Sequence, residues 1–253
     1  SSVAPNTLHL AVRRNPSHHH RTRLQGPCCH RGVGAAPPTF LAHPAIFRSV
    51  TAGGVPEIGM PVDRETLARQ GEVLLSREPV WITDDLVFLG EIPRRFPFEG
   101  QGACGECNGA PDTVPDDTAL AYCSKDGLVV ITGCAHAGIC STIARAKEVC
   151  GESRIACVIG GFHLLDAAQE QIDATCRYFA GLDAGAVHPC HCTGFAATIA
   201  LAGAANVSET GVRLWSLFPG APYKIQQLDP KASLLLWYVI GCCSDGIDSA
   251  HSL

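Results

Sequence analysis

The fold is decided by LVVITGCAHAGIC (residues 128–140) and by two later segments of the same kind, RIACVIGGFHLLD (154–166) and AGAVHPCHCTG (184–194). Each is a short apolar run that glycine or proline interrupts near its end, which is the pattern of a buried strand. A histidine stands at each interruption: His136, His163 and His191, spaced 27 and 28 residues apart. A metal site built on strand ends has this pattern in sequence.

The surrounding sequence alternates between strand and helix. Apolar residues at strand or helix spacing predict strands at 118–123, 128–132, 155–159 and 184–187, and helices at 141–149, 167–180 and 195–204. This alternation favours an α/β layered domain. Upstream, Asp63 is a suitable N-cap for a helix within residues 63–74 that Gly71 ends. Residues 79–89 predict two short strands around a turn.

Composition limits the classes of function. The chain has 253 residues, 46% of them apolar and 17% charged, which is globular rather than disordered. A net charge of −5 gives no basic footprint for nucleic acid. The longest apolar run, residues 232–243, is too short to span a bilayer. With 14 scattered cysteines and no secretory signal at the first residues, we expect a reducing, cytoplasmic setting and no membrane contact.

The three histidines permit metal chemistry. Active groups in α/β layers gather where strands end, because loops converge there without disturbing the core. Neutral imidazole is the commonest ligand for zinc, iron or manganese, and three histidines with an open position suit hydrolysis. The alternative is that each histidine is a hydrogen-bonded structural residue. Three in equivalent positions, each beside glycine, favour a divalent metal site, with zinc preferred over iron or manganese.

Other candidate residues have two interpretations each. Cys134 and Cys192 stand beside the histidines and are either thiolate ligands or buried inert thiols. Asp117 is either a turn former or a group that orients a histidine ligand. Cys104 and Cys107 form a lone CxxC within residues 101–115, which is half of a zinc site, a redox pair, or part of a surface loop. We favour the loop.

Further motifs in the sequence resemble those of a known protein family. GLVVITGCAHAGI, VIGGFHL and HCTG, in that order, with GEIPR and DDTALAY upstream, resemble the metallo-β-lactamase superfamily over residues 39–212. The branch they resemble is that of the 7,8-dihydropterin-6-yl-methyl-4-(β-D-ribofuranosyl)aminobenzene 5′-phosphate synthase-like proteins. The resemblance implies an αββα sandwich with one or two metals at the sheet edges.

The resemblance also implies roles for individual residues. His136 matches the metal ligand of the third family motif, and His191 matches the ligand of the last. His163 stands where many relatives have a bridging aspartate. The predicted metal ligands are therefore His136, His163 and His191, and the candidate catalytic residues are His163 and Asp117.

The sequence departs from the family at its first motif, because HxHxDH is absent. The nearest stretch is SHHHRTRLQG, residues 17–26, in a segment rich in Arg, Pro, Cys and His. We hypothesise that residues 1–38 are an altered, frame-shifted remnant of that region. The predicted organisation is thus an irregular segment 1–38, a truncated domain at 39–212 and a tail at 213–253, with the sandwich incomplete at its N-terminus.

These observations predict a metal-dependent hydrolase that acts on an anionic small molecule, phosphorylated or pterin-like, through metal-bound hydroxide. Two alternatives stay open: a pterin-transferring synthase, and a non-catalytic remnant or binding protein of the same fold. The sequence leaves the substrate and the oligomeric state undetermined.

Overall fold

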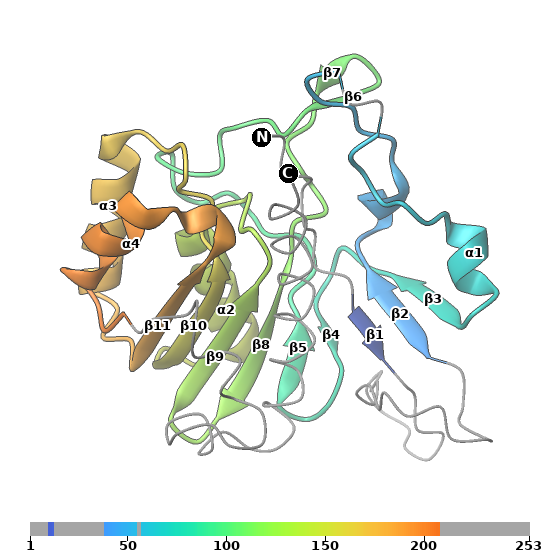
Figure 1. Cartoon of the computed structure of the whole chain (residues 1–253). Coiled ribbons are helices and arrows are strands. Elements are labelled where there is room, and N and C mark those ends of the chain that lie inside the picture. The colour runs from blue at the N-terminus through green and yellow to red at the C-terminus, as the bar shows by residue number, and fades with distance from the viewer. Residues whose placement is uncertain (1–9, 13–37, 55–56, 208–253) are drawn as a thin grey trace, which may run out of the picture.

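The computed structural model describes residues 10–12, 38–54 and 57–207, and a six-stranded mixed sheet lies at its centre (Figure 1). The strand order is β11-β10-β9-β8-β5-β4. The neighbouring strands β9, β10 and β11 are parallel, and the remaining pairs are antiparallel. The strands are β4 (Val80–Trp81), β5 (Leu86–Phe88), β8 (Ala119–Ser124), β9 (Gly127–Thr132), β10 (Ile155–Gly161) and β11 (Ala186–Cys190).

Three helices cover one face of this sheet. They are α2 (Ile139–Cys150), α3 (Gln169–Ala180) and α4 (Phe195–Ala202). Because side chains alternate along a strand, Val130, Val158 and Val187 point to the helices and share one buried core with them. Val129 and Ile159 belong to a second core on the opposite face. The sequence is therefore apolar on both sides of the central strands, as a layered fold requires.

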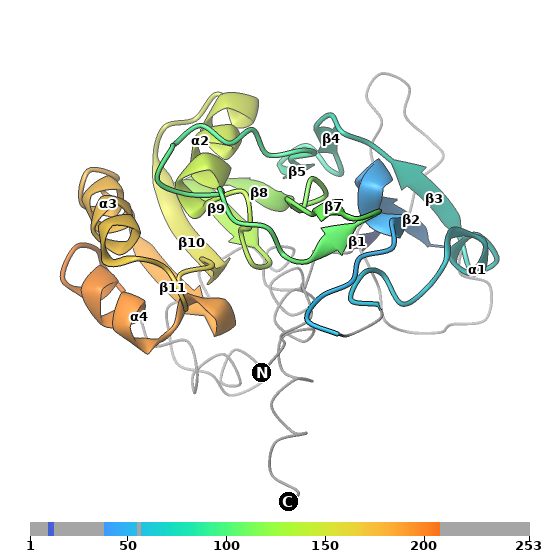
Figure 2. The same cartoon turned by 90° about the horizontal axis from the view of Figure 1, so that it is seen from above.

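A second, smaller sheet lies beside the β4 edge in both views (Figures 1 and 2). It contains β1 (Leu10–Val12), β2 (Thr39–Ala42) and β3 (Glu72–Leu75), and Leu41 of β2 packs into the second core. Short elements complete the chain: η1 (Pro44–Phe47), α1 (Arg64–Ala68), a hairpin of β6 (Glu106–Cys107) and β7 (Ala110–Pro111), and η2 (His191–Thr193).

Most predicted elements around the sheet are confirmed, including the helix that Asp63 caps and that ends before Gly71, and the structure adds two strands upstream. The helix capped by Asp63 ends at Ala68, and Glu72–Leu75 is a strand because it pairs in parallel with β2. Residues 10–12, in the segment predicted to be irregular, form a strand that pairs with β2. In both cases pairing with a distant strand outweighs local preference. The stretch 17–26 and the tail 213–253 lie outside the described residues.

Within the described ranges, we find no helix that has both the length and the apolar character needed to cross a membrane.

A buried carboxylate caps helix α2 from a distance. Gly138 precedes the helix and offers no side chain. Glu99 instead accepts hydrogen bonds from the backbone N–H groups of Cys140 (3.1 Å) and Ser141 (2.7 Å), and from the Ser141 hydroxyl (2.8 Å). These bonds satisfy donors that a helix start leaves unpaired. Burial nevertheless outweighs them and raises the pKa of Glu99.

A pH-dependent stability follows from Glu99. Since its pKa is higher in the folded protein than in the unfolded chain, its stabilising share is complete below about pH 4.5 and is lost as pH rises through the folded-state pKa. We expect the free energy of unfolding of the wild type to fall over this window relative to that of Glu99→Gln, as measured by urea denaturation. The control is Glu170→Gln on the exposed face of α3. Parallel pH profiles for wild type and Glu99→Gln would contradict this expectation.

The close approach of β9 and β10 depends on a glycine. Gly160 has a φ of +136°, and a Cβ there would lie 2.1 Å from the backbone oxygen of Thr132. We predict that Gly160→Ala lowers the free energy of unfolding by about 2–4 kcal/mol, through backbone strain and overpacking. Gly181→Ala, whose Cβ meets nothing closer than 3.7 Å, should change it by less than about 0.5 kcal/mol. Equal urea midpoints for the two variants would refute the prediction.

Candidate metal centre

The three histidines lie at one edge of the sheet, where β9, β10 and β11 end. His136 follows β9 by four residues, His163 follows β10 by two, and His191 directly follows β11. Because these strands are parallel neighbours, their carboxyl ends meet at the same edge. The sequence-based placement of all three histidines at strand ends is therefore confirmed.

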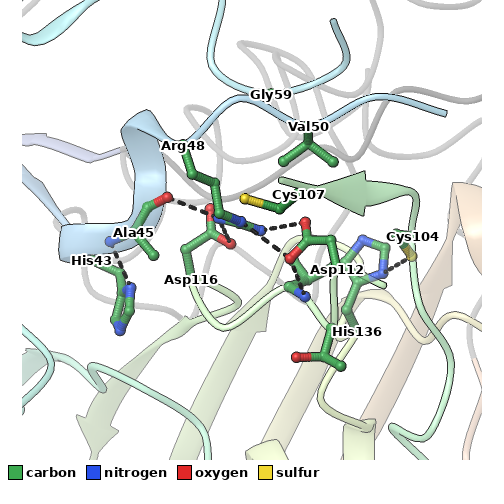
Figure 3. Close-up of polar contacts among 12 residues, drawn as sticks. His43, Ala45, Arg48, Val50, Gly59, Cys104, Cys107, Asp112, Asp116 and His136 are labelled. Atoms are coloured by element: carbon green, nitrogen blue, oxygen red, sulfur yellow. Dashed lines mark hydrogen bonds and ion pairs between the residues drawn. The ribbon is translucent and has the colours of Figure 1, made fainter. Parts of the chain in front are cut away.

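The first group at this edge contains Cys104, His136 and His163. The rings of His136 and His163 have centroids 4.3 Å apart. The Cys104 Sγ lies 3.1 Å from His136 Nδ1 and 3.9 Å from His163 Nε2. Figure 3 shows Cys104 reaching His136 from the loop that carries the β6–β7 hairpin. His136 is buried, Cys104 is half-buried and His163 is exposed, so the group opens to solvent on one side.

The second group contains Cys134, His191 and Cys192. The Cys134 Sγ lies 3.0 Å from His191 Nε2, and the Cys192 thiol donates to the Cys134 carbonyl at 3.6 Å. A Cβ on Gly161 would lie 2.4 Å from the Cys192 Sγ and 2.7 Å from the His191 ring, so glycine is required where β10 passes this group. Hydrogen bonding with Cys192, followed by burial, raises the pKa of the Cys134 thiol.

The sequence suggested one site for three histidines, whereas the structure sorts them into two neighbouring groups. In each group the candidate ligand atoms lie within 4.8 Å of one another. His163 belongs with His136, and His191 belongs with the two cysteines of the second group. That these side chains bind metal stays a prediction.

Electrostatics favour the neutral, metal-binding form of His136. Burial, and then the charge of His163, lower the pKa of His136 to about 3. The Cys104 side chain acts in the opposite direction on His163, whose pKa is raised. A histidine must be neutral to coordinate a metal, so His136 needs no deprotonation at neutral pH.

Asp117 holds the loop that carries His136. It is buried, and its carboxylate accepts the Ala137 N–H at 2.8 Å. Burial raises the pKa of Asp117 to about 6, although hydrogen bonds from the backbone of Ala137 and His136 oppose this. Asp117 therefore positions His136 by holding the backbone of the His136 loop, and not by a hydrogen bond to the His136 ring. This refines the interpretation that Asp117 orients a histidine ligand.

Other polar side chains near this edge have structural contacts. His43 caps η1 by accepting the Ala45 N–H at 3.1 Å. Asp116 lies 2.5 Å from the Arg48 guanidinium. Arg94 donates to the backbone oxygens of Gly100 and Thr113, and its charge acts on His136. Of the CxxC pair, Cys104 joins the first group. The sequence interpretation of this cysteine as part of a surface loop missed that contact, because nothing local indicates where the loop folds back.

The donor set fits a divalent metal. His136 Nε2 is buried, and no hydrogen-bond partner for it lies in the part of the chain that the structure describes. An unpaired buried nitrogen is costly unless something binds it. Histidine and cysteine donors that converge within 4.8 Å are the usual ligands of zinc and similar ions. The residues present can therefore hold such an ion.

Comparisons with known proteins agree with this geometry. The chain is 34% identical over 173 residues to the 7,8-dihydropterin-6-methyl-4-(beta-D-ribofuranosyl)-aminobenzene-5'-phosphate synthase of Methanocaldococcus jannaschii, covering 62% of this chain and 58% of the relative. It is 31% identical over 160 residues to an uncharacterized protein of the same organism, covering 62% and 59%. The chain thus spans less than two thirds of the length of either relative.

A solved structure is also similar. It is that of Tm1679, a metal-dependent hydrolase of the beta-lactamase superfamily, with a TM-score of 0.60, 27% identity and 69% coverage of each chain. No family model matches the sequence.

The fold is that of the metallo-β-lactamase superfamily, and the strand-end histidines together with these relatives support the classification of the chain with that superfamily. Within it, the chain resembles the branch that contains the M. jannaschii pterin-related synthase.

Asp117 provides a test of how the His136 loop is held. We expect Asp117→Ala to lower the free energy of unfolding by about 1–3 kcal/mol, because it leaves a buried N–H unpaired. It should also weaken zinc binding about 10–100-fold through misplacement of His136. Asp117→Asn, which keeps one acceptor oxygen, should fall between this variant and wild type. Urea denaturation and zinc titration measure both effects, with exposed Asp173→Ala as control. Wild-type zinc affinity in a folded Asp117→Ala variant would disprove the role.

Proposed function

We propose that the protein is a metal-dependent hydrolase of phosphorylated or otherwise anionic small molecules. The observation that carries the proposal is the meeting of His136, His163 and His191 at the carboxyl edge of the sheet, with His136 Nε2 buried and unpaired among the described residues. The similarity to a solved metal-dependent hydrolase of the beta-lactamase superfamily supports it.

His136 and His163 in the first group, and His191 in the second, are the residues that would hold divalent metal, for which we propose zinc, with iron or manganese as alternatives. When bound, such an ion supplies Lewis acidity and lowers the pKa of a water molecule to about 7. Asp117 holds the His136 loop in position. His163 is exposed at the solvent side of its group, so that an ion held there would be open to a substrate.

A positive charge beside the site supports an anionic substrate. Arg94 is fixed by two neutral carbonyl oxygens, those of Gly100 and Thr113, and its charge acts on His136 and Asp117. Guanidinium groups are well suited to carboxylate and phosphate. The M. jannaschii relative is named as a synthase whose product name contains a 5'-phosphate, which agrees with a phosphorylated ligand. We further propose a cytoplasmic protein without nucleic-acid or membrane partners.

A second candidate function is a non-catalytic binding protein of the same fold. The specific observation in its favour is that HxHxDH, the first metal motif of the family resemblance, is absent from the sequence. A pterin-transferring synthase is the alternative reaction on the same ligand class.

Turnover of model substrates tests the proposal. Protein stripped with a chelator and reloaded with zinc should hydrolyse bis(p-nitrophenyl) phosphate, with manganese and iron assayed in parallel, and chelation should abolish the rate. His163→Ala should lower kcat/KM by about 100-fold or more, as expected for loss of a metal ligand. Cys176→Ser on α3 is the control. A folded, metal-loaded protein without turnover of phosphate mono- or diesters would reject the hydrolase and favour the binding protein.

A further inference from the structure

We propose that Cys104 is a metal ligand that forms, with His136 and His163, a thiolate–imidazole site selective for zinc over manganese or magnesium. The inference rests on the metal binding in the proposed function and is independent of the hydrolytic step. It assigns a role to a loop cysteine outside the motifs that carry the family resemblance.

The distances suit coordination of one ion. Ligand atoms around a tetrahedral zinc, with bonds of about 2.0–2.3 Å, lie about 3.3–3.8 Å from one another. The Cys104 Sγ is 3.1 Å from His136 Nδ1 and 3.9 Å from His163 Nε2. Small side-chain movements would bring all three donors to one ion. The three residues also leave a fourth position open, as in catalytic zinc sites.

The His136 ring supplies independent support. It is 7% exposed, and its ring centroid lies 4.3 Å from that of His163. A hydrogen bond between Cys104 and His136 Nδ1 would by itself leave the nearby His163 without a role. A metal bound at this group provides a role for both histidines.

Hydrogen bonds from several parts of the chain hold the Cys104 loop in place. Its N–H donates to the Asp112 carbonyl at 2.8 Å, and the Asp112 N–H donates to the Gly105 carbonyl at 2.9 Å. Arg48 donates two hydrogen bonds to the Asp112 carboxylate, from Nη2 (2.7 Å) and from Nε (3.1 Å), as Figure 3 shows. Glu106 and Thr51 exchange backbone hydrogen bonds of 2.8 and 2.9 Å. The thiol is thus positioned by contacts with three separate parts of the chain.

Backbone strain also marks this place. His163 has a φ of +52°, and Ala135, which directly precedes His136, has a φ of +52°. Non-glycine residues in this region cost about 1–3 kcal/mol each and persist where the surrounding structure enforces them. Both strained residues deliver a histidine to the Cys104 group, so the fold sustains this strain to bring the donors together.

The donor chemistry determines the selectivity. Thiolate is a soft ligand that favours zinc and related ions, whereas manganese and magnesium prefer oxygen donors. A site with one thiolate and two imidazoles should therefore bind zinc or cobalt and discriminate strongly against manganese and magnesium.

Cobalt spectroscopy tests thiolate ligation directly. The full-length, reduced, metal-free chain is titrated with cobalt(II), and the thiolate-to-cobalt charge-transfer band in the near ultraviolet is recorded. The measurement is repeated in a Cys134→Ser/Cys192→Ser background, so that the second group contributes no thiolate. In this background Cys104→Ser should abolish the band, whereas Cys107→Ser, in the same loop, should keep it.

Zinc affinity and alkylation complete the test. Cys104→Ser should weaken zinc binding, measured by competition with a chelator dye. The loss of affinity should exceed the roughly 10–100-fold loss typical of mutating a residue that only contacts a metal ligand. Cys104→Asp, which replaces sulfur with an oxygen donor, should recover part of the affinity without the band, and its recovery shows that the fold is intact. Zinc, but not manganese, should slow iodoacetamide alkylation of Cys104.

The outcomes separate this inference from the hydrolase proposal. Wild-type zinc affinity and an unchanged band in Cys104→Ser would overturn the ligand role even if hydrolysis persists. Alkylation of Cys104 that zinc leaves unaffected would also overturn it and would favour a Cys104–His136 nucleophilic pair. A Cys104-dependent band without hydrolysis would support the ligand and reject the hydrolase.

Discussion

The structure depends on the close parallel packing of β9, β10 and β11. Gly160 allows β10 to pass the backbone of Thr132, and Gly161 leaves space for His191 and Cys192. Once these strands are in register, their carboxyl ends open at a common edge, and each chain segment leaves the sheet with a histidine in its first residues. The convergence of the donors is thus a consequence of strand packing rather than of any local motif.

The edge is prepared electrostatically as well as sterically. His136 is buried in its neutral form, Asp117 ties down its backbone, and Arg94 adds positive charge. Under the proposed function, a cation bound beside His136 and the charge of Arg94 would both favour an anionic ligand. The proposed metal site would open to solvent on the side of the exposed His163.

Two thiol-containing groups distinguish this site from one made of histidines alone. Cys104 and the Cys134–Cys192 pair bring sulfur to both halves of the edge. The N-terminal segment does not supply the HxHxDH motif of the resembled family. Residues close to the strand ends and one folded-back loop instead gather donors there, so the potential to bind metal is spread over four parts of the chain.

The central strands, the helices α2, α3 and α4, and the positions of the three histidines were predictable from sequence, because apolar periodicity and glycine breaks report local geometry directly. The resemblance to the metallo-β-lactamase superfamily was accessible too, since the motifs that carry it lie in those same segments. Two features were decided only by tertiary structure. The strand Glu72–Leu75 forms because β2 pairs with it, and Cys104 reaches His136 because Asp112 and Arg48 fold its loop back. Both depend on contacts between residues far apart in the chain, which no local pattern records.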